Sequence, residues 1–457
     1  MAILVENLAI MVGKTDKNPQ LNVFKPLISS FINLTHELCV LAKQIEWEKL
    51  EQEFIPYYKN FGRPSVPLRK MIGLVLLKHI YNLSDENVVE RWKENPYWQH
   101  FCGEIYFQTN NPIDPSEFVH FRNRIGEEGV EKLLKLSISL FGKESEDNEV
   151  CIDSTVQEKN ITFPTDTKLQ NKIIKKCIKI ADKEEIKLRQ TYKRVIKKLM
   201  LEQRFRSHPK RKKKALSAAR KIKTIAGRLV RDIERKMTEE QAKKYQKELL
   251  IFKRVLKQER NSKDKIYSLH EPDVKCIAKG KESKQYEFGN KSSIVMTRTS
   301  GIIVGALAFK ENIYDGDTLP SQIEQVKRLT NHAPKVAIVD RGYRGRKKVF
   351  ETEIVSPKVP TKNATQYQKR KARKRFRARA GIEPIIGHIK HDHRMLRNYL
   401  KGTIGDSINT ILAATGFNFM KRLRQIKAEI KNLLYYFFQK EILYKIYLLL
   451  FLKKWTF

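Results

Sequence analysis

Residues 166–265 form a lysine-rich block that separates one short strand-like segment from all later ones. The block contains 35 Lys and Arg, 12 Asp and Glu, one proline (Pro209) and one glycine (Gly227). Its apolar side chains, such as Ile186 and Leu229, are scattered among good helix formers, which predicts long helices packed as an antiparallel pair. The block is therefore expected to be a helical insertion, with the rest of the fold on either side of it.

The segments outside the block predict an α/β fold. Strands are expected at 150–156, 285–297, 301–309, 335–340 and 353–359, and helices at 319–331, 375–395 and 405–431. Few polar residues separate the second and third strands, which predicts a hairpin. The expected order is three strands, a helix, a strand, a helix, a strand and two helices. An antiparallel hairpin joined to parallel strands in this order predicts an RNase H-like core with a basic helical insertion.

The first 145 residues predict an all-α domain. Leu41, Ile45, Leu50, Phe54 and Ile55 are spaced for one apolar helix face.

Helix-start signals follow in close succession. Pro67 precedes the apolar run 68–77, and Ser84 is placed to cap a helix over 86–93. In the sequence 114–117, Asp-Pro-Ser-Glu, the aspartate is expected to cap a helix that has proline at its first position. Short capped helices suit a compact DNA-binding unit, although they fit a helical dimerisation or packing domain equally well.

The positive charge is concentrated in two segments. The formal net charge is +40; residues 166–265 contribute +23, residues 341–401 contribute +15, and the other 296 residues contribute +2. A charge of this size points to a polyanionic partner, either nucleic acid or an anionic membrane.

The remaining composition argues against a membrane and for the cytoplasm. Five scattered cysteines show no zinc spacing, so free thiols in a reducing compartment are expected. The N-terminus lacks the pattern of a signal peptide. The apolar tail 433–457 is interrupted by Lys440, Glu441 and Lys445, so we expect an amphipathic or buried helix instead of a membrane span.

Three carboxylates fall where the proposed fold would bring them together. Asp153 lies inside the first strand, Asp340 ends the fourth, and Glu383 begins a late helix. Clustered carboxylates repel one another unless they bind cations, and oxygen ligands favour Mg²⁺ or Mn²⁺. Two such ions can support in-line displacement at a phosphodiester. Each carboxylate also has an ordinary alternative as a turn or capping residue.

Other polar groups near these positions are expected to be structural or exposed. His388, His391 and His393 do not share one helical face, so phosphate contact or surface exposure is favoured over zinc binding. Glu271 and Asp273 are expected to be structural. Pro384 predicts that a helix begins or kinks there, which would leave Arg379 on the entry loop.

The motifs around these carboxylates resemble those of a known enzyme family. Phe376, Arg379, Glu383 and Lys390 are spaced like the Tyr-Arg-Glu-Lys signature of the bacterial insertion-sequence DDE transposases of the families numbered four and five. Residues 340–343, Asp-Arg-Gly-Tyr, and 152–155, Ile-Asp-Ser-Thr, are similar to the two aspartate motifs of the same families. Residues 61–92 and 114–129 resemble the N-terminal domain of the five-type group, and the likeness spans about 45–420.

The resemblance implies a role for each motif residue. Asp153, Asp340 and Glu383 would bind two Mg²⁺ or Mn²⁺ ions. Arg379 and Lys390 would hold DNA phosphates, and Arg341 and Tyr343 of the second motif are also expected at the DNA. Phe376 replaces the family tyrosine, so its ring could stack or pack, but a hydroxyl contact to phosphate is lost.

The implied function is transposition. The helical domain 1–145 would recognise terminal inverted repeats, and the core (146–165 and 266–432) would release a 3′-hydroxyl and join it to target DNA. The family implies a homodimer on double-stranded DNA in the bacterial cytoplasm, at the nucleoid, and no small-molecule substrate. A stand-alone metal-dependent nuclease and a non-catalytic or domesticated DNA-binding protein are the alternatives.

Overall fold

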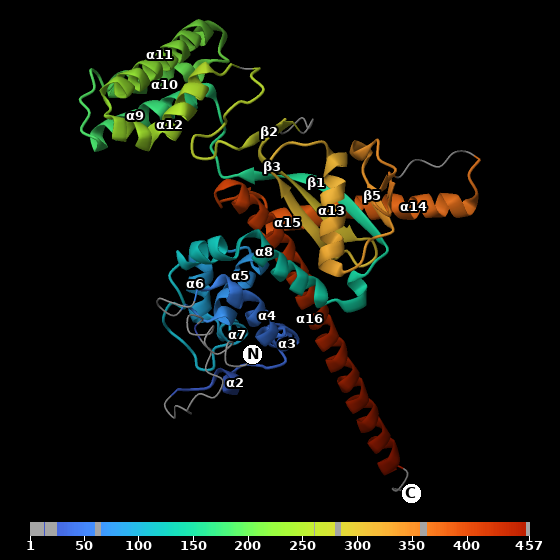
Figure 1. Ribbon diagram of the computed structural model, residues 1–457. Coiled ribbons are helices and arrows are strands. Elements are labelled where there is room, and N and C mark those ends of the chain that lie inside the picture. Colours follow the sequence, from blue (N-terminus) through green and yellow to red (C-terminus); the bar gives the residue numbers. More distant parts are fainter. Residues whose placement is uncertain are drawn as a thin grey trace.

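The computed structural model describes residues 13, 25–59, 65–259, 261–278, 285–356 and 363–453, without the side chains of 437–438 and 440–453. Figure 1 shows a group of N-terminal helices below a mixed β-sheet, a separate helical bundle beside the sheet, and a long C-terminal helix that crosses the molecule.

One sheet contains all the strands of the described residues. They are β1 (Glu149–Lys159), β2 (Lys275–Ala278), β3 (Tyr286–Thr297), β4 (Ile303–Phe309), β5 (Val336–Val339), β6 (Lys348–Val349), β7 (Thr352–Val355) and β8 (Arg397–Asn398). The main strands lie in the order β4-β3-β1-β5-β7, and β2, β6 and β8 add short pairings to β3, β7 and β1. β3 is antiparallel to β1 and β4, whereas β5 is parallel to β1 and β7. The predicted hairpin and its junction with parallel strands are therefore confirmed.

The prediction of a helix between the fourth and fifth strands is wrong. In its place the chain forms a 3₁₀ turn, η6 (Arg341–Tyr343), and then β6. Residues 341–348 are dominated by Arg, Lys and Gly and carry little apolar surface, and Gly345 has φ 107°, so no helix face could pack on the sheet. The fifth strand ends at Val355, and the rest of the expected range to 359 lies partly outside the described residues.

The basic block contains four helices, not an antiparallel pair. They are α9 (Asp166–Lys183), α10 (Lys193–Glu202), α11 (Lys212–Lys236) and α12 (Glu239–Lys257). Ile173, Ile222 and Phe252 are completely buried in a hydrophobic cluster separate from the rest of the protein. Glu185 and Tyr192 reverse the chain between α9 and α10 with positive φ, a role that glycine usually fills. The sequence therefore carries no turn residue that would have revealed this break.

The N-terminal region is helical, as predicted. Its helices are α2 (Ile28–Phe31), α3 (Glu37–Gln44), α4 (Trp47–Phe54), α5 (Leu68–Ile80), α6 (Asp85–Glu94), α7 (Pro96–Phe101) and α8 (Glu117–Ser139). Ser84 caps α6 by accepting a hydrogen bond from the amide of Asn87. α8 begins later than expected, after Ser116, because Asp114 caps the turn that precedes the helix. The single apolar helix face expected for Leu41, Leu50 and Phe54 is divided between α3 and α4, although all three residues are buried in the same hydrophobic cluster.

Three helices follow β7 where two were expected. They are α14 (Gln366–Ala380), α15 (Ile382–Asp392) and α16 (Gly402–Lys453). α16 packs against α5, α8 and β4 and then continues away from the body of the protein (Figure 1). Leu433, Leu434, Tyr435 and Tyr436 are exposed on this extension. Within the described part of the chain, no helix is apolar over a sufficient length to span a bilayer.

Candidate functional site

The sheet places two of the predicted carboxylates side by side. Ile152 of β1 pairs with Val339 of β5, so Asp153 lies next to Asp340, the residue that follows β5. Asp153 and Cys151 lie on the same face of β1 because side chains alternate along a strand. Cys151 packs with Ile382 of α15, so this face of the sheet is the one that α15 covers. Strand register and helix packing together bring the start of α15 to Asp153.

The third carboxylate is joined to the second by an arginine. Glu383 lies in the first turn of α15, and Arg379 lies one helical turn earlier, in the last turn of α14. The Arg379 Nη2 atom is 3.3 Å from Asp340 Oδ2 and 3.2 Å from Glu383 Oε1. One guanidinium therefore partly neutralises both carboxylates.

The expectation that Pro384 would leave Arg379 on an entry loop is wrong. α14 and α15 meet at Gly381, which has right-handed helical φ and ψ, so the chain turns helically through the junction. Pro384 is the third residue of α15. At that position an amide has no partner within the helix, so the missing N–H of proline breaks no hydrogen bond.

Asp153 has an unusual environment for a carboxyl group. Burial raises its pKa to about 6, the negative charges of Asp340 and Glu383 act in the same direction, and the Ser154 amide and Arg379 oppose them. The Ser154 amide donates to Asp153 Oδ1 at 2.8 Å. A half-buried aspartate beside two further carboxylates is a typical cation ligand, because either a proton or a bound cation must relieve the repulsion.

The three carboxylates do not form a ready-made metal cage. No group of three His, Cys, Asp or Glu residues in the described chain is arranged to hold a metal ion. Arg379 lies between Asp340 and Glu383 and supplies positive charge there. The donor set nevertheless suits a hard divalent cation, since all three side chains offer carboxylate oxygen.

A second polar group lies on the opposite face of β1 and was missed from the sequence. The Ser154 hydroxyl donates to Asp315 Oδ1 at 2.7 Å, and Lys291 Nζ donates to the same oxygen at 2.8 Å. Asp315 is the first residue of α13 (Asp315–Thr330). The sequence contained no clear signal for this group, because Ser154 and Lys291 are only two of several polar residues in β1 and β3.

The other motif residues occupy different surroundings. Tyr343 is only 2% exposed, and burial raises the pKa of its hydroxyl. Arg341 is exposed beside it. Phe376 is 48% exposed on α14, one turn before Arg379. Lys390 lies in the last turn of α15, two turns beyond Glu383.

The three histidines bind different partners. His388 Nδ1 is 2.7 Å from Asp392, the His391 carbonyl accepts from Asn82, and His393 Nδ1 is 2.9 Å from the His79 carbonyl. His393 is buried, so surface exposure or phosphate contact does not apply to it. His393 instead fixes the end of α15 to the N-terminal helices.

Glu271 and Asp273 have separate environments. Glu271 is buried, 3.4 Å from Lys159, as expected for a structural carboxylate, and Asp273 is exposed.

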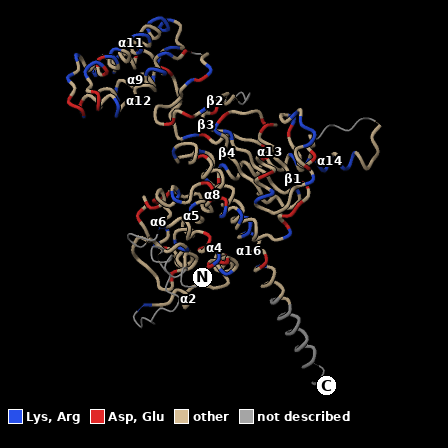
Figure 2. The backbone as a smooth tube through the Cα atoms, in the orientation of Figure 1, with Lys and Arg blue, Asp and Glu red and all other residues tan. Residues whose placement is uncertain are grey.

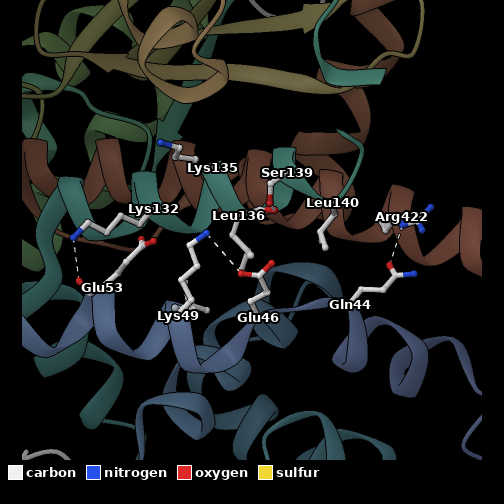
Figure 3. Close-up of a pocket in the computed structure, with 11 residues that line it drawn as sticks. Gln44, Glu46, Lys49, Glu53, Lys132, Lys135, Leu136, Ser139, Leu140 and Arg422 are labelled. Carbon is white, nitrogen blue, oxygen red and sulfur yellow. Dashed lines mark hydrogen bonds and ion pairs between the residues drawn. The ribbon is translucent and has the colours of Figure 1, made fainter. Parts of the chain in front are cut away.

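A cleft between α4, α8 and α16 is a weaker candidate (Figure 3). It encloses about 470 Å³, but Lys49 pairs with Glu46, Lys132 donates to the Glu53 carbonyl, and Arg422 donates to Gln44. Three of its four cations therefore already have partners within the protein, and only Lys135 has none among the described residues.

Two known domain families match the chain in order. Residues 27–124 match the family described as "Transposase domain (DUF772)", and residues 257–419 match the "Transposase DDE domain". The second match includes Asp340, Arg379, Glu383 and Lys390, whereas Asp153 lies between the two matches.

A relative from Rhizobium meliloti, "Uncharacterized protein ORF8 in nfe locus", is 40% identical over 201 residues, which is 43% of this chain and 94% of that protein. No solved structure matches the chain. On the two domain matches, the chain belongs to the DDE transposases, with the domain architecture of the insertion-sequence families numbered four and five.

Proposed function

We propose that this transposase binds the terminal inverted repeats of an insertion sequence, cleaves DNA at the element end and joins the 3′-hydroxyl to target DNA. The observation that carries the proposal is the placement of Asp153 beside Asp340, with Glu383 linked to Asp340 through Arg379. The strand order β4-β3-β1-β5-β7, in which only β3 is antiparallel to β1, supports an RNase H-like core for this chemistry.

We propose a separate role for each part of the chain. Element-end recognition is assigned to the domain 1–145, and catalysis to the core formed by 146–165 and 266–432. The bundle over 166–265 tracks flanking or target DNA, and the tail 433–457 lies outside these roles.

Asp153, Asp340 and Glu383 are the proposed metal ligands. When bound there, two Mg²⁺ or Mn²⁺ ions would activate the attacking oxygen and stabilise the leaving oxygen of the phosphodiester. Arg379 supplies the positive charge that Asp340 and Glu383 require in the absence of metal. With metal bound, the same guanidinium is free to hold a DNA phosphate, for which its planar fork is well suited.

The DNA is expected to follow the basic surface. Figure 2 shows Lys and Arg concentrated along α14 and on the bundle, on either side of the sheet. α14 has eight Lys and Arg among 15 residues and no buried residue. Arg341, Phe376, Arg379 and Lys390 are the proposed DNA-contacting residues near the carboxylates. The expected contact of Tyr343 with DNA does not hold, because its side chain is buried; it is proposed instead to hold the turn after Asp340 in place.

Joining two element ends requires two active sites, so we propose a homodimer on double-stranded DNA. Neither the chemistry nor the basic surface calls for a small-molecule substrate. The polycationic surface fits a protein that works at the bacterial nucleoid in the cytoplasm.

The test is to mix the full chain with paired element ends, a target plasmid and Mg²⁺ or Mn²⁺. Joined products whose formation is abolished by Asp153→Asn support the proposal. Cleavage without joining would identify a stand-alone nuclease. DNA binding without cleavage would identify a non-catalytic binding protein. Nicking that is unchanged in Asp153→Asn would remove the proposed site.

A further inference from the structure

A basic groove lies directly beside Asp340, at the ends of β5 and β7. The loop that follows β5 folds against the end of β7 and encloses about 720 Å³. Val339 and Arg341, the neighbours of Asp340 in the chain, both line the groove. A ligand that fills it therefore reaches the proposed active site without crossing another element.

The loop over 341–347 is fixed at several points. Tyr343 is buried beneath it, and the Tyr314 hydroxyl donates to the Arg344 carbonyl at 2.7 Å. Arg346 pairs with Asp317 at 2.7 Å, and the Ile354 amide donates to the Lys347 carbonyl at 2.9 Å. A loop held in this way loses little conformational entropy when a ligand binds.

The side chains presented by this loop are strongly cationic. Arg341, Arg344, Arg346 and Lys347 line the groove, and Glu353 is its one acidic lining residue. Of the four cations, Arg346 has its partner in Asp317, whereas no carboxylate among the described residues pairs with Arg341, Arg344 or Lys347. Three exposed cations on a rigid loop form a site for an extended polyanion and not for a single small anion.

We propose that this groove holds the sugar-phosphate backbone of the DNA strand that runs past Asp340. The proposal rests on the function proposed above and names where the DNA leaves the active site. Contacts to phosphate position DNA without reading its sequence, so the groove binds DNA of any sequence. Arg344 and Lys347 are the residues whose removal should weaken this contact, since neither is a proposed metal ligand.

The experiment measures DNA binding without catalysis. The full-length protein is titrated onto a short duplex of arbitrary sequence in EDTA, over a range of salt concentrations, by fluorescence anisotropy. Each phosphate contact contributes roughly 0.9 to the slope of log affinity against log salt. The double variant Arg344→Gln/Lys347→Gln should therefore lower the magnitude of the slope by about 2.

The matched control is Lys327→Gln/Lys335→Gln. It removes the same charge from exposed positions near the end of α13 and directly before β5, neither of which lines the groove. The control should keep the parental slope.

A parental slope in the groove variant, or an equal loss in the control, overturns the proposal. If the slope falls only in the groove variant, but the parent protein does not cleave DNA with metal, the groove is supported and the proposed reaction is rejected.

Discussion

Ser154 donates a hydrogen bond of 2.7 Å to Asp315, a residue 161 positions later in the chain. Ser154 makes hydrogen bonds on both faces of β1: its amide donates to Asp153, and its hydroxyl donates to Asp315. Asp315 also accepts from Lys291, whose ammonium group donates to the Ile313 carbonyl. We infer that Asp315 is a positioning residue, which holds β1 and therefore Asp153 in place from the far side of the sheet.

Replacing Asp315 should therefore weaken metal binding without removing a ligand. Asp315→Asn keeps an acceptor for Ser154 but loses the ion pair with Lys291, so we expect a loss of roughly 10- to 100-fold in Mn²⁺ affinity, as for other groups that orient ligands. The free energy of unfolding should fall by roughly 1–3 kcal/mol. Mn²⁺ titration followed by electron paramagnetic resonance measures the first effect.

Asp317→Asn is the control for this variant. Asp317 lies two residues further along α13, is exposed, and pairs with the exposed Arg346. Its replacement should leave Mn²⁺ affinity unchanged. Equal losses in the two variants would show that Asp315 has no special connection to the site.

The charge on Asp153 should destabilise the metal-free fold. Its pKa is raised from 3.8 to about 6, so the folded state holds a proton more tightly than the unfolded state between these values. Stability is therefore lost as the pH rises through this window, and the full penalty is present above it.

Asp153→Asn removes that charge and should stabilise the protein at about pH 8 by on the order of 1–3 kcal/mol, while abolishing metal-dependent cleavage. The gain should disappear near pH 4, where the parental carboxyl is protonated in the folded state. Thermal unfolding at both pH values tests this. A variant that is less stable than the parent at pH 8 would contradict the assignment of a buried, repelled carboxylate.

Arg379 should compete with a bound cation for Asp340 and Glu383. Its guanidinium contacts both carboxylates, so Arg379→Gln should tighten Mn²⁺ binding at pH 8 by about 3- to 10-fold although DNA cleavage falls. Arg375→Gln is the control, because Arg375 lies one turn earlier on α14 and pairs with Glu149 at 3.4 Å. If Arg379→Gln weakens Mn²⁺ binding, the arginine helps to hold the metal site together instead of competing with it.

Local patterns in the sequence were sufficient for much of the fold. The two β-rich runs 286–297 and 303–309, separated by a few polar residues and Gly301, mark the hairpin, and Ser84 marks the start of α6. The lysine-rich block revealed that its residues are helical but not how many helices they form. Glu185 and Tyr192 adopt positive φ without being glycine, so the break between α9 and α10 follows from tertiary packing and not from local preference.

In the candidate site, too, some residues could be predicted from local patterns and others depend on tertiary contacts. Asp153, Asp340, Glu383 and Arg379 could be identified from motif spacing. Asp315 could not, because its role depends on a hydrogen bond to Ser154 across the chain. The burial of Tyr343 was also hidden, since a polar motif residue beside Arg341 gives no sign that the next turn points inward.

A buried cluster of charged side chains joins α5, α6 and α8 in the N-terminal region. Lys78 and Arg122 are both almost fully buried and share one carboxylate, Asp85, which is 2.6 Å from the lysine and is held by two bonds of 2.9 and 2.8 Å from the arginine. Burial alone would raise the pKa of Asp85, but the two cations lower it to about 2. Burial also lowers the pKa of Lys78 to about 8, and the charge of Arg122 adds to this effect.

Asp85→Asn would leave two buried cations with no counter-charge from Asp85, which should destabilise the fold by roughly 3–5 kcal/mol. Because the folded-state pKa of Asp85 is lowered, its contribution in the parent is present above its usual value of 3.8 and is lost only as the pH falls toward 2. Asp85 raises the pKa of Lys78, so in the variant Lys78 should lose its proton below the parental value of about 8, and stability should rise with pH from there. Chemical denaturation at about pH 7 and about pH 9 measures this recovery, and Asp114→Asn, at an exposed cap, should lose far less stability at both.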